Sequence, residues 1–380
     1  MSAIIGFESD RPLVSAERWA CSVLHPIRAD ELDVLSVEWN RLAERHRSPT
    51  HRIEWIQASL SSLWRAETGP VRIHLVRRGG RLTAAAAMRR RHEWASYYWE
   101  DLGTREMQEP ADLLYETEED LAVLLDAMLR ESGPFVLCRL PGESVVPRLL
   151  EQRLGRAGRM RVIPGRRYPY VPLDKFPEAE LNSGRRSDLR RMRRRAEQQG
   201  ALRLELLRPT PEQVPALLDL AIEIEAASWK IGSQHALKLN AKTQGFLRDY
   251  LPRVARAGLL RMPFLYIGDR PVAMQIAVAS GGGYWLLKIG YDAALGSVAP
   301  GQLMMQDTLK ACVDEGLKSY ELWGSAAEWT RMWTRQEMAS HCVEAYPAGW
   351  ASLRRLSAMA LRKVVSVAQR RLGLAPKEEG

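Results

Sequence analysis

The chain has 380 residues, with 55 Lys and Arg against 46 Asp and Glu, so its formal net charge is +9. Hydrophobic residues make up 46% and charged residues 27%, a balance that excludes a disordered or collagen-like chain. No stretch approaches the roughly 20 consecutive apolar residues that cross a bilayer, and the N-terminus lacks a basic start followed by an apolar run. We therefore expect a cytoplasmic protein of about two domains.

The positive charge is concentrated in two segments. Residues 185–195 and 351–372 each carry a net charge of +6, which leaves −3 for the rest of the chain. A uniformly basic, nucleic-acid-coating surface is therefore not expected, and neither is a DNA partner. The charge pattern instead favours two local partners.

Cysteine and histidine spacing gives no sign of a metal or redox centre. The cysteines are too far apart for a zinc knuckle or a CxxC pair, and we expect four ordinary buried thiols: Cys21, Cys138, Cys312 and Cys342. The seven histidines form no i, i+4 pair and none has a nearby Cys, so no metal site is expected.

The first half reads as a series of α/β elements. A helix over 30–47 precedes a hairpin over 71–88 that turns at Gly79 and Gly80. A strand at 96–102, a helix at 118–131, a strand at 135–139 and a helix at 144–157 follow.

The second half repeats this order. A hairpin over 259–280 turns at Gly268 and Asp269, and it is followed by a strand at 283–291, a helix at 301–315, a strand at 319–323 and a helical stretch near 325–334. Such duplication predicts two related α/β (α+β) domains, each a mixed twisted sheet flanked by helices. We expect the domains to span 1–175 and 176–346, followed by a basic amphipathic helix and tail over 347–380.

Two helices are predicted between the repeats. The Arg-rich one begins at a cap formed by Asn182 or Ser183 and ends at Gly200, and its arginines fall on nearly every face. In the next, over 212–230, five residues share one stripe at i, i+3, i+4 spacing: Leu218, Ala221, Ile222, Glu225 and Trp229. Glu225 is therefore expected on the buried side.

Five motifs in the second half resemble the CelD-like acyltransferase group of the GNAT superfamily, whose double-domain architecture is shared with the FemABX peptidyltransferases. They cover roughly residues 170–345 and read RRSDLRRMRRRAEQQG, IEAASWK, GDRPVAMQIA, GYDAALGSVAPGQLM and YELWGSAAEWTRMW. The first half matches more loosely. Where that family usually has an aromatic residue followed by lysine, this chain has Trp329 and Thr330.

The resemblance implies two tandem GNAT-like domains, with acyl-CoA as co-substrate bound by the second. Its donor cradle would be the start of the helix at 301, where backbone N–H groups face the coenzyme A diphosphate. The residues expected there are Ala299, Pro300, Gly301 and Gln302. Backbone amides around Ile289 and Tyr291, at the splayed end of the central strand, would polarise the thioester carbonyl. The alternative is that Pro-Gly simply starts a helix.

For the base that deprotonates the acceptor amine, Glu225 is the first candidate, because a desolvated carboxylate has a raised pKa. The alternative is a half-buried structural carboxylate satisfied by a neighbouring Arg, and Lys230 could also compete by pairing with Glu225. Asp292 and His235 are reserve candidates. The sequence has no GxSxG elbow and no Cys-His signature, so we expect direct transfer without an acyl-enzyme.

Expected acceptor-binding residues are basic or aromatic. Arginine guanidinium groups can donate two parallel hydrogen bonds to a phosphate group, so Arg186 and Arg190 are expected to bind a phosphate of the acceptor. The alternative is an arginine face that is simply solvated. Trp229 and Trp323, with Lys230, would line an acceptor cleft, although tryptophans are often simply core.

The basic tail (351–372) has its apolar residues largely on one face and its cations on the other. It predicts either contact with an anionic membrane surface, at the inner face of the membrane, or a helix packed on the protein.

These observations predict an acyl-CoA-dependent N-acyltransferase whose acceptor is a small molecule or lipid, such as an exopolysaccharide sugar or a sphingoid base. The alternatives are an aminoacyl-tRNA-dependent transferase of the FemABX kind and a non-catalytic scaffold of an envelope synthase. Transfer from aminoacyl-tRNA is less expected than transfer from acyl-CoA.

Overall fold

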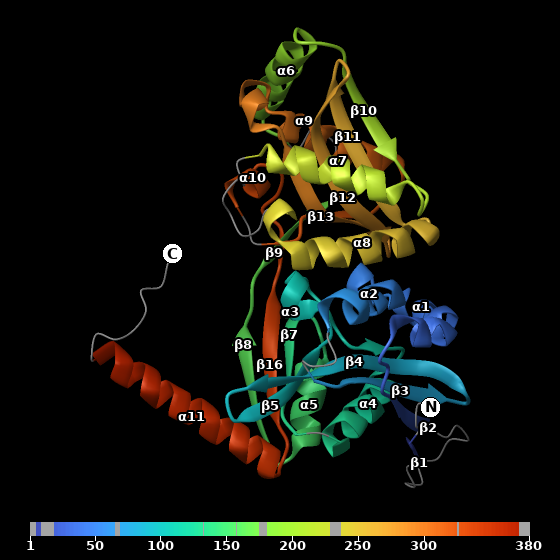
Figure 1. Cartoon of the computed structure of the whole chain (residues 1–380), viewed down its shortest axis with the longest axis vertical. Helices are drawn as coiled ribbons and strands as arrows, with labels where there is room; N and C mark the ends of the chain where they lie inside the picture. Colours follow the sequence, from blue (N-terminus) through green and yellow to red (C-terminus); the bar gives the residue numbers. More distant parts are fainter. Residues whose placement is uncertain are drawn as a thin grey trace.

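The computed structural model describes residues 5–8, 19–64, 69–131, 133–156, 158–174, 181–228, 237–324 and 327–371. Figure 1 shows two α/β units stacked along the long axis, each built on one sheet. The predicted mixed α/β class with a repeated element order is confirmed.

The first unit contains the larger sheet. Its strands run in the order β1 (Ile5–Glu8), β2 (Trp19–Leu24), β3 (Val71–Arg78), β4 (Arg81–Glu93), β5 (Ser96–Asp101), β7 (Phe135–Pro141), β16 (Ser340–Tyr346) and β8 (Arg159–Pro164), and β6 (Leu114–Tyr115) pairs with β4. The predicted hairpin turn is confirmed, because Gly79 and Gly80 both have positive φ. The helices of this unit are α1 (Ser36–Ala43), α2 (Ile53–Ala58), α3 (Thr104–Met107), α4 (Glu118–Glu131) and α5 (Val146–Leu154).

The second unit has a sheet in the order β10 (Leu202–Leu207), β11 (Leu260–Ile267), β12 (Arg270–Ser280), β13 (Gly283–Tyr291), β14 (Ser319–Glu321), β9 (Tyr168–Pro172) and β15 (Glu337–Met338). Its helices are α6 (Ser183–Glu197), α7 (Val214–Ala226), α8 (Ala241–Arg256), α9 (Pro300–Asp314) and α10 (Glu328–Arg331). Alternate residues of β12 face opposite sides, so that Met274 and Ile276 pack with α7 and α8, whereas Ala273 and Ala277 pack on the side of α9. The central strands are therefore covered on both faces.

The second unit is inserted into the first. Its strands β9 to β15 are consecutive in the chain, whereas β16, which follows β15, returns to the first sheet and lies between β7 and β8. The domain boundaries predicted at 175/176 and 346/347 thus differ from the sheets, because a strand's partner is chosen by long-range pairing that its own residues do not reveal.

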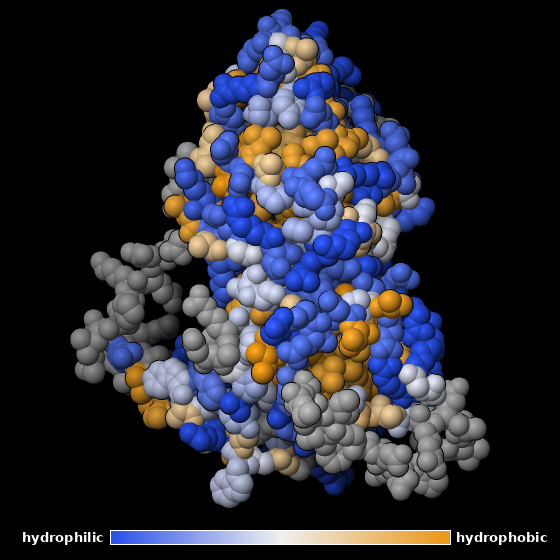
Figure 2. All heavy atoms as spheres, turned by 45° about the vertical axis from the view of Figure 1, so that its right-hand side comes forward, coloured by the Kyte–Doolittle hydropathy of each residue, from blue (hydrophilic) through white to orange (hydrophobic). Residues whose placement is uncertain are grey.

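An aromatic cluster joins the two units. Trp55 of α2 contacts Phe246 and Tyr250 of α8 edge-on, with ring centroids 4.8 and 5.2 Å away, and Trp323 lies 6.0 Å from Trp55. In Figure 1, α8 forms the base of the upper unit and faces α2. The visible hydrophobic residues in Figure 2 form separate patches on the upper and lower units, with a largely hydrophilic band between them. The apolar part of the junction is therefore internal.

The last helix, α11 (Trp350–Arg371), extends away from the lower unit (Figure 1). Ser352 and Arg355 are buried, and the Arg355 guanidinium lies 4.4 Å from the ring centre of Tyr98 and 2.6 Å from the Glu93 carboxylate. The large apolar side chains that are exposed among the described ones of this helix are Trp350, Leu353, Leu361 and Val364. Among the described residues, no helix has both the length and the apolar character to cross a membrane.

Two of the four cysteines are not the ordinary buried thiols that we expected. Cys138 on β7 and Cys342 on β16 are half-buried, and their sulfur atoms lie 2.9 Å apart across neighbouring strands. Their separation by 204 positions hid this contact. The hydrogen bond from Cys342 lowers the pKa of Cys138 to about 7, whereas burial raises the pKa values of Cys21 and Cys312.

We therefore expect Cys138 to become thiolate as the pH rises through about 7, so that iodoacetamide labels it well before Cys21 or Cys312. Mild oxidation with glutathione disulfide should join Cys138 to Cys342, since exchange proceeds through a mixed disulfide that the second thiolate resolves. Peptide mapping of the alkylated and the oxidised protein measures both effects. Labelling of all four thiols at one rate would contradict the prediction.

Candidate functional site

The central strand of the second sheet diverges from its neighbour. β13 pairs with β14 in parallel only over Gly283–Trp285, whereas its pairing with β12 continues to Tyr291. An additional residue on β13, Leu287, shifts the register opposite Ile276 and Ala277. Such a bulge bends and twists a strand, which helps β13 and β14 to separate.

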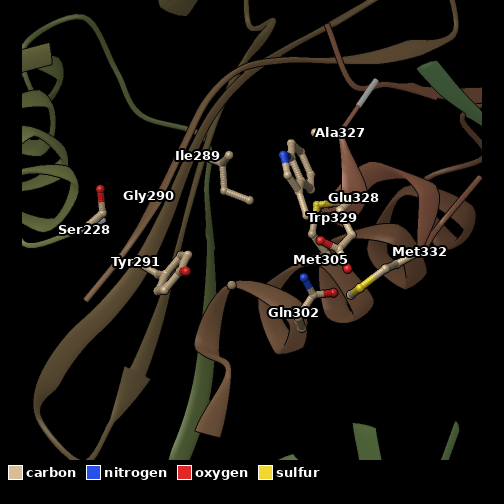
Figure 3. A pocket seen from close by; sticks show the side chains of 11 residues that line it. Ser228, Ile289, Gly290, Tyr291, Gln302, Met305, Ala327, Glu328, Trp329 and Met332 are labelled. Atoms are coloured by element: carbon tan, nitrogen blue, oxygen red, sulfur yellow. The ribbon is translucent and has the colours of Figure 1, made fainter. Parts of the chain in front are cut away.

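A cavity of about 510 Å³ opens where the two strands separate. It lies between the end of β13, the first turns of α9 and the short helix α10, as Figure 3 shows. Most of its wall is apolar, and its lining residues are Ser228, Ile289, Gly290, Tyr291, Gly301, Gln302, Met305, Ala327, Glu328, Trp329 and Met332. An apolar cavity with few polar groups is typical of a small-molecule site.

The start of α9 forms one wall of the cavity, and its residues leave room for a ligand to approach the backbone closely. Ala299, just before the helix, has φ of 47°, a left-handed conformation that costs a non-glycine residue about 1–2 kcal/mol. At Gly301, a Cβ atom would lie 2.9 Å from the Tyr291 ring, so only glycine fits without moving that ring. Pro300 has no N–H, and the amides of Gln302 and Leu303 donate to the Ala299 carbonyl. This helix start therefore offers an anion fewer free N–H groups than an ordinary one.

Gln302 presents a polar group to the cavity. Its Oε1 atom is buried and accepts no hydrogen bond, and the side chain lies beside Met305 and Met332 in Figure 3. A buried acceptor without a donor costs about 1–3 kcal/mol. A bound molecule with an N–H group at this point would remove that cost.

Glu328 is the carboxylate that lines the cavity, and our sequence analysis missed it. It is the first residue of α10, with an exposed side chain on the wall facing β13 (Figure 3). Its position inside the motif YELWGSAAEWTRMW, just after the predicted strand, is a signal that could have identified it. The neighbouring Thr330 closes the turn, because its hydroxyl accepts from the Ala327 N–H at 2.9 Å and donates to the Ala327 carbonyl at 2.8 Å. Thr330 in place of a lysine therefore has a structural role.

The predicted bases lie elsewhere. Glu225 on α7 is fully buried as expected, but it packs behind β13, where its Cα and Cβ atoms would lie 2.9 and 3.0 Å from a Cβ at Gly290, and its carboxylate accepts from the Leu237 N–H at 2.6 Å. Asp292 caps the 3-10 helix Ala293–Val298 by accepting from the Ala294 N–H at 2.9 Å, and it pairs with Arg270. Neither lines the cavity.

The predicted donor residues are better placed than the predicted acceptor residues. Ile289, Tyr291, Gly301 and Gln302 line the cavity, whereas Ala299 and Pro300 form the helix start beside it. Trp323 belongs to the aromatic junction, and Arg186 and Arg190 on α6 line none of the described cavities near α10. Trp229, Lys230 and His235 lie outside the described residues. Within the described ranges, no group of side chains is arranged to hold a metal ion.

Known proteins share this architecture. Residues 183–331, from the first residue of α6 to the last of α10, match the model of the acetyltransferase (GNAT) domain family, and no curated protein matches the chain significantly. FemX is 11% identical, with 82% of this chain and 95% of FemX covered and a TM-score of 0.57. A conserved protein of unknown function from Bacteroides thetaiotaomicron VPI-5482 is also 11% identical, with 85% and 99% covered and a TM-score of 0.54.

The C-terminal domain (DUF2156) of a putative lysylphosphatidylglycerol synthetase from Agrobacterium fabrum is 14% identical, with 88% of this chain and 96% of that domain covered and a TM-score of 0.52. At these identities the likeness concerns the fold. The comparisons thus support the GNAT superfamily and the double architecture, without reaching the CelD-like group. Residues 183–331 of the second unit thus match a GNAT-type domain, and most of the chain shares its double α/β fold with FemX.

Proposed function

We propose that the chain is an acyltransferase of the CelD-like kind, which moves an acyl group from acyl-CoA to an amine or hydroxyl of a cell-envelope precursor, such as an exopolysaccharide sugar or a sphingoid base. The cavity at the divergence of β13 and β14 carries this proposal. It lies inside the segment that matches the GNAT domain, and the start of α9 forms its wall.

Three features of the cavity support acyl-CoA as the donor. The pantetheine arm and acyl chain are largely apolar, as are Met305, Trp329 and Met332 around them. An amide N–H of the arm would satisfy the unpaired Gln302 Oε1. The positive end of the α9 dipole, close to Gly301, favours the diphosphate.

Transfer would be direct. The acceptor nitrogen attacks the thioester carbonyl carbon, the C–S bond breaks with departure of the coenzyme A thiolate, and the ammonium proton leaves the nitrogen. Glu328 would accept that proton, directly or through one water, because its carboxylate faces the place where β13 and α10 meet. The apolar walls limit competing hydrolysis by excluding other water.

Replacing Gly301 by alanine tests the donor site. The new methyl group would displace the Tyr291 ring, which lines the cavity, and we expect affinity for acetyl-CoA or palmitoyl-CoA to fall about tenfold. Gly296→Ala is the matched control, since nothing lies within 4 Å of a Cβ there. Calorimetric titration measures both variants. The donor site would be wrong if neither coenzyme bound the wild type, or if Gly301→Ala bound them unchanged.

Aminoacyl transfer from tRNA is the second candidate, since FemX shares the fold and α6 presents exposed arginines. These are Arg190, Arg191, Arg194 and Arg195. tRNA binding through such a face falls steeply with salt. A gel-shift series at increasing salt therefore distinguishes the two donors, because acyl-CoA transfer requires no tRNA.

We further propose that α11 contacts an anionic membrane, which suits a lipid-linked acceptor. Leu361 and Val364 are 59% and 65% exposed, and Arg354 lies on the same helix. Apolar burial together with about 1 kcal/mol per cation near the lipid drives such binding.

Leu361→Glu with Val364→Glu should abolish flotation with phosphatidylglycerol vesicles. The double variant Val34→Glu with Val37→Glu, at exposed positions of the first unit, should leave flotation unchanged. Equal flotation of the α11 variant and the wild type would show that α11 does not bind the membrane.

A further inference from the structure

A second cavity, of about 490 Å³, is lined by the last residue of α10 and the five residues after it, and it shares Met332 with the first cavity. The end of β9, the start of α6 and the segment after α10 form its walls. Its charged lining residues are all arginines: Arg185, Arg331 and Arg335. Its lining, as the structure describes it, includes no carboxylate.

The side chains of these arginines have no ion pair within the described residues, and Asp188, three residues along α6 from Arg185, pairs with Arg191. Elsewhere in the same unit arginines are paired, as in Arg193 with Asp307, Arg261 with Glu315 and Arg270 with Asp292. Within the part of the chain that the structure describes, neither a hydrogen bond nor an ion pair to a carboxylate is made by the side chains of Arg185, Arg331 and Arg335.

The buried polar atoms that lack a partner at this cavity are donors. They are Nε and one terminal nitrogen of Arg185, and Nε1 of Trp333. Burial also lowers the pKa of Arg185. Leaving a charged donor unsatisfied costs more than the 1–3 kcal/mol of a neutral one, so the Arg185 side chain gains by turning toward an acceptor in the cavity.

Phosphate is the acceptor that this arrangement suits. Guanidinium groups bind phosphate oxygens through two parallel N–H···O bonds, and three of them can share the charge of a diphosphate. Carboxylate side chains, which would repel an anion, are not among the described lining residues.

We propose that this arginine-lined cavity binds the phosphate or diphosphate group of a substrate of the acyltransferase. The inference rests on the proposed function for its biological meaning, because the adjoining apolar cavity is the acyl-transfer site. The phosphate has two possible sources, which are the 3′-phosphate end of coenzyme A and a phosphate-linked acceptor. Arg185 and Arg331 would then anchor the phosphate, in place of Arg186 and Arg190.

Calorimetric titration of the full chain with inorganic pyrophosphate tests the site without any acyl transfer. Arg185→Gln and Arg331→Gln should each weaken pyrophosphate binding about tenfold or more. Arg190→Gln is the matched control, since Arg190 is exposed on the same helix but does not line the cavity. Absence of pyrophosphate binding by the wild type, or equal weakening in all three variants, would overturn the proposal.

A second titration identifies the molecule that supplies the phosphate. If coenzyme A binds more tightly than dephospho-coenzyme A, and Arg185→Gln removes the difference, the 3′-phosphate occupies the cavity. If both coenzymes bind equally and alongside pyrophosphate, the phosphate belongs to the acceptor. Failure of the donor site would appear in the Gly301→Ala titration, whereas failure of this site would appear with pyrophosphate.

Discussion

Replacing Glu328 by glutamine is expected to lower kcat for acyl transfer by about 10²-fold or more, because general base catalysis contributes about 10²–10⁴-fold. The Glu328 side chain lies on the cavity wall (Figure 3), where the proposed acceptor would meet the thioester. Glutamine keeps the size and hydrogen-bonding reach of the side chain but accepts no proton. Donor affinity should therefore stay within about twofold of the wild type. Steady-state kinetics with a panel of amino sugars and sphingoid bases, together with acyl-CoA titration, measures both quantities.

Glu225→Gln is the informative control. The new amide retains an oxygen that accepts from the Leu237 N–H, so the buried contact survives while the negative charge is lost. We expect turnover close to that of the wild type. The opposite pattern, with activity kept by Glu328→Gln and lost by Glu225→Gln at unchanged donor affinity, would return the role of base to Glu225.

The elements that the sequence predicted well are those with local signals. Both hairpins were located because alternating apolar residues flank tight turns, at Gly79 and Gly80 in the first and at Gly268 in the second. Where local signals are weak the predictions differed: the helix expected at 325–334 is confined to Glu328–Arg331, and α8 was not foreseen. The assignment of β9 to the second sheet and of β16 to the first depends on long-range pairing, and no residue within either strand encodes that choice.

The residues of the candidate site also differ in how well the sequence predicted them. The start of α9 was predicted, because Pro followed by Gly opens a helix beside the central strand, and Gly301 and Gln302 do line the cavity. The positions of carboxylates and arginines were less predictable. Successive residues of a helix point about 100° apart, so Arg185 reaches a cavity that Arg186 does not, and packing of α6 on its neighbours decides which one does. Glu225 was correctly expected to be buried, but burial does not tell which side of β13 its carboxylate occupies.

Phe246→Ala is expected to lower the free energy of unfolding by about 3–5 kcal/mol, the usual cost of removing a buried aromatic side chain. Phe246 is fully buried, lies edge-on to Trp55 of the first unit and is stacked on Tyr250 at 5.2 Å. The cavity would lie at the junction of the units, between Trp55 and Tyr250. Urea unfolding followed by tryptophan fluorescence and by far-ultraviolet circular dichroism measures the effect.

The insertion of the second unit determines the form of that transition. Because the second unit is inserted between β8 and β16 of the first and both units bury rings at the aromatic junction, unfolding of either unit exposes the other's part of that junction. Both probes should therefore report a single midpoint, shifted together by Phe246→Ala. Leu239→Ala, at a residue that is 63% exposed, should change the free energy by less than about 0.5 kcal/mol. Two separated transitions in the wild type would show that the junction does not couple the units, and a Phe246→Ala effect as small as that of Leu239→Ala would show that the aromatic junction contributes little to stability.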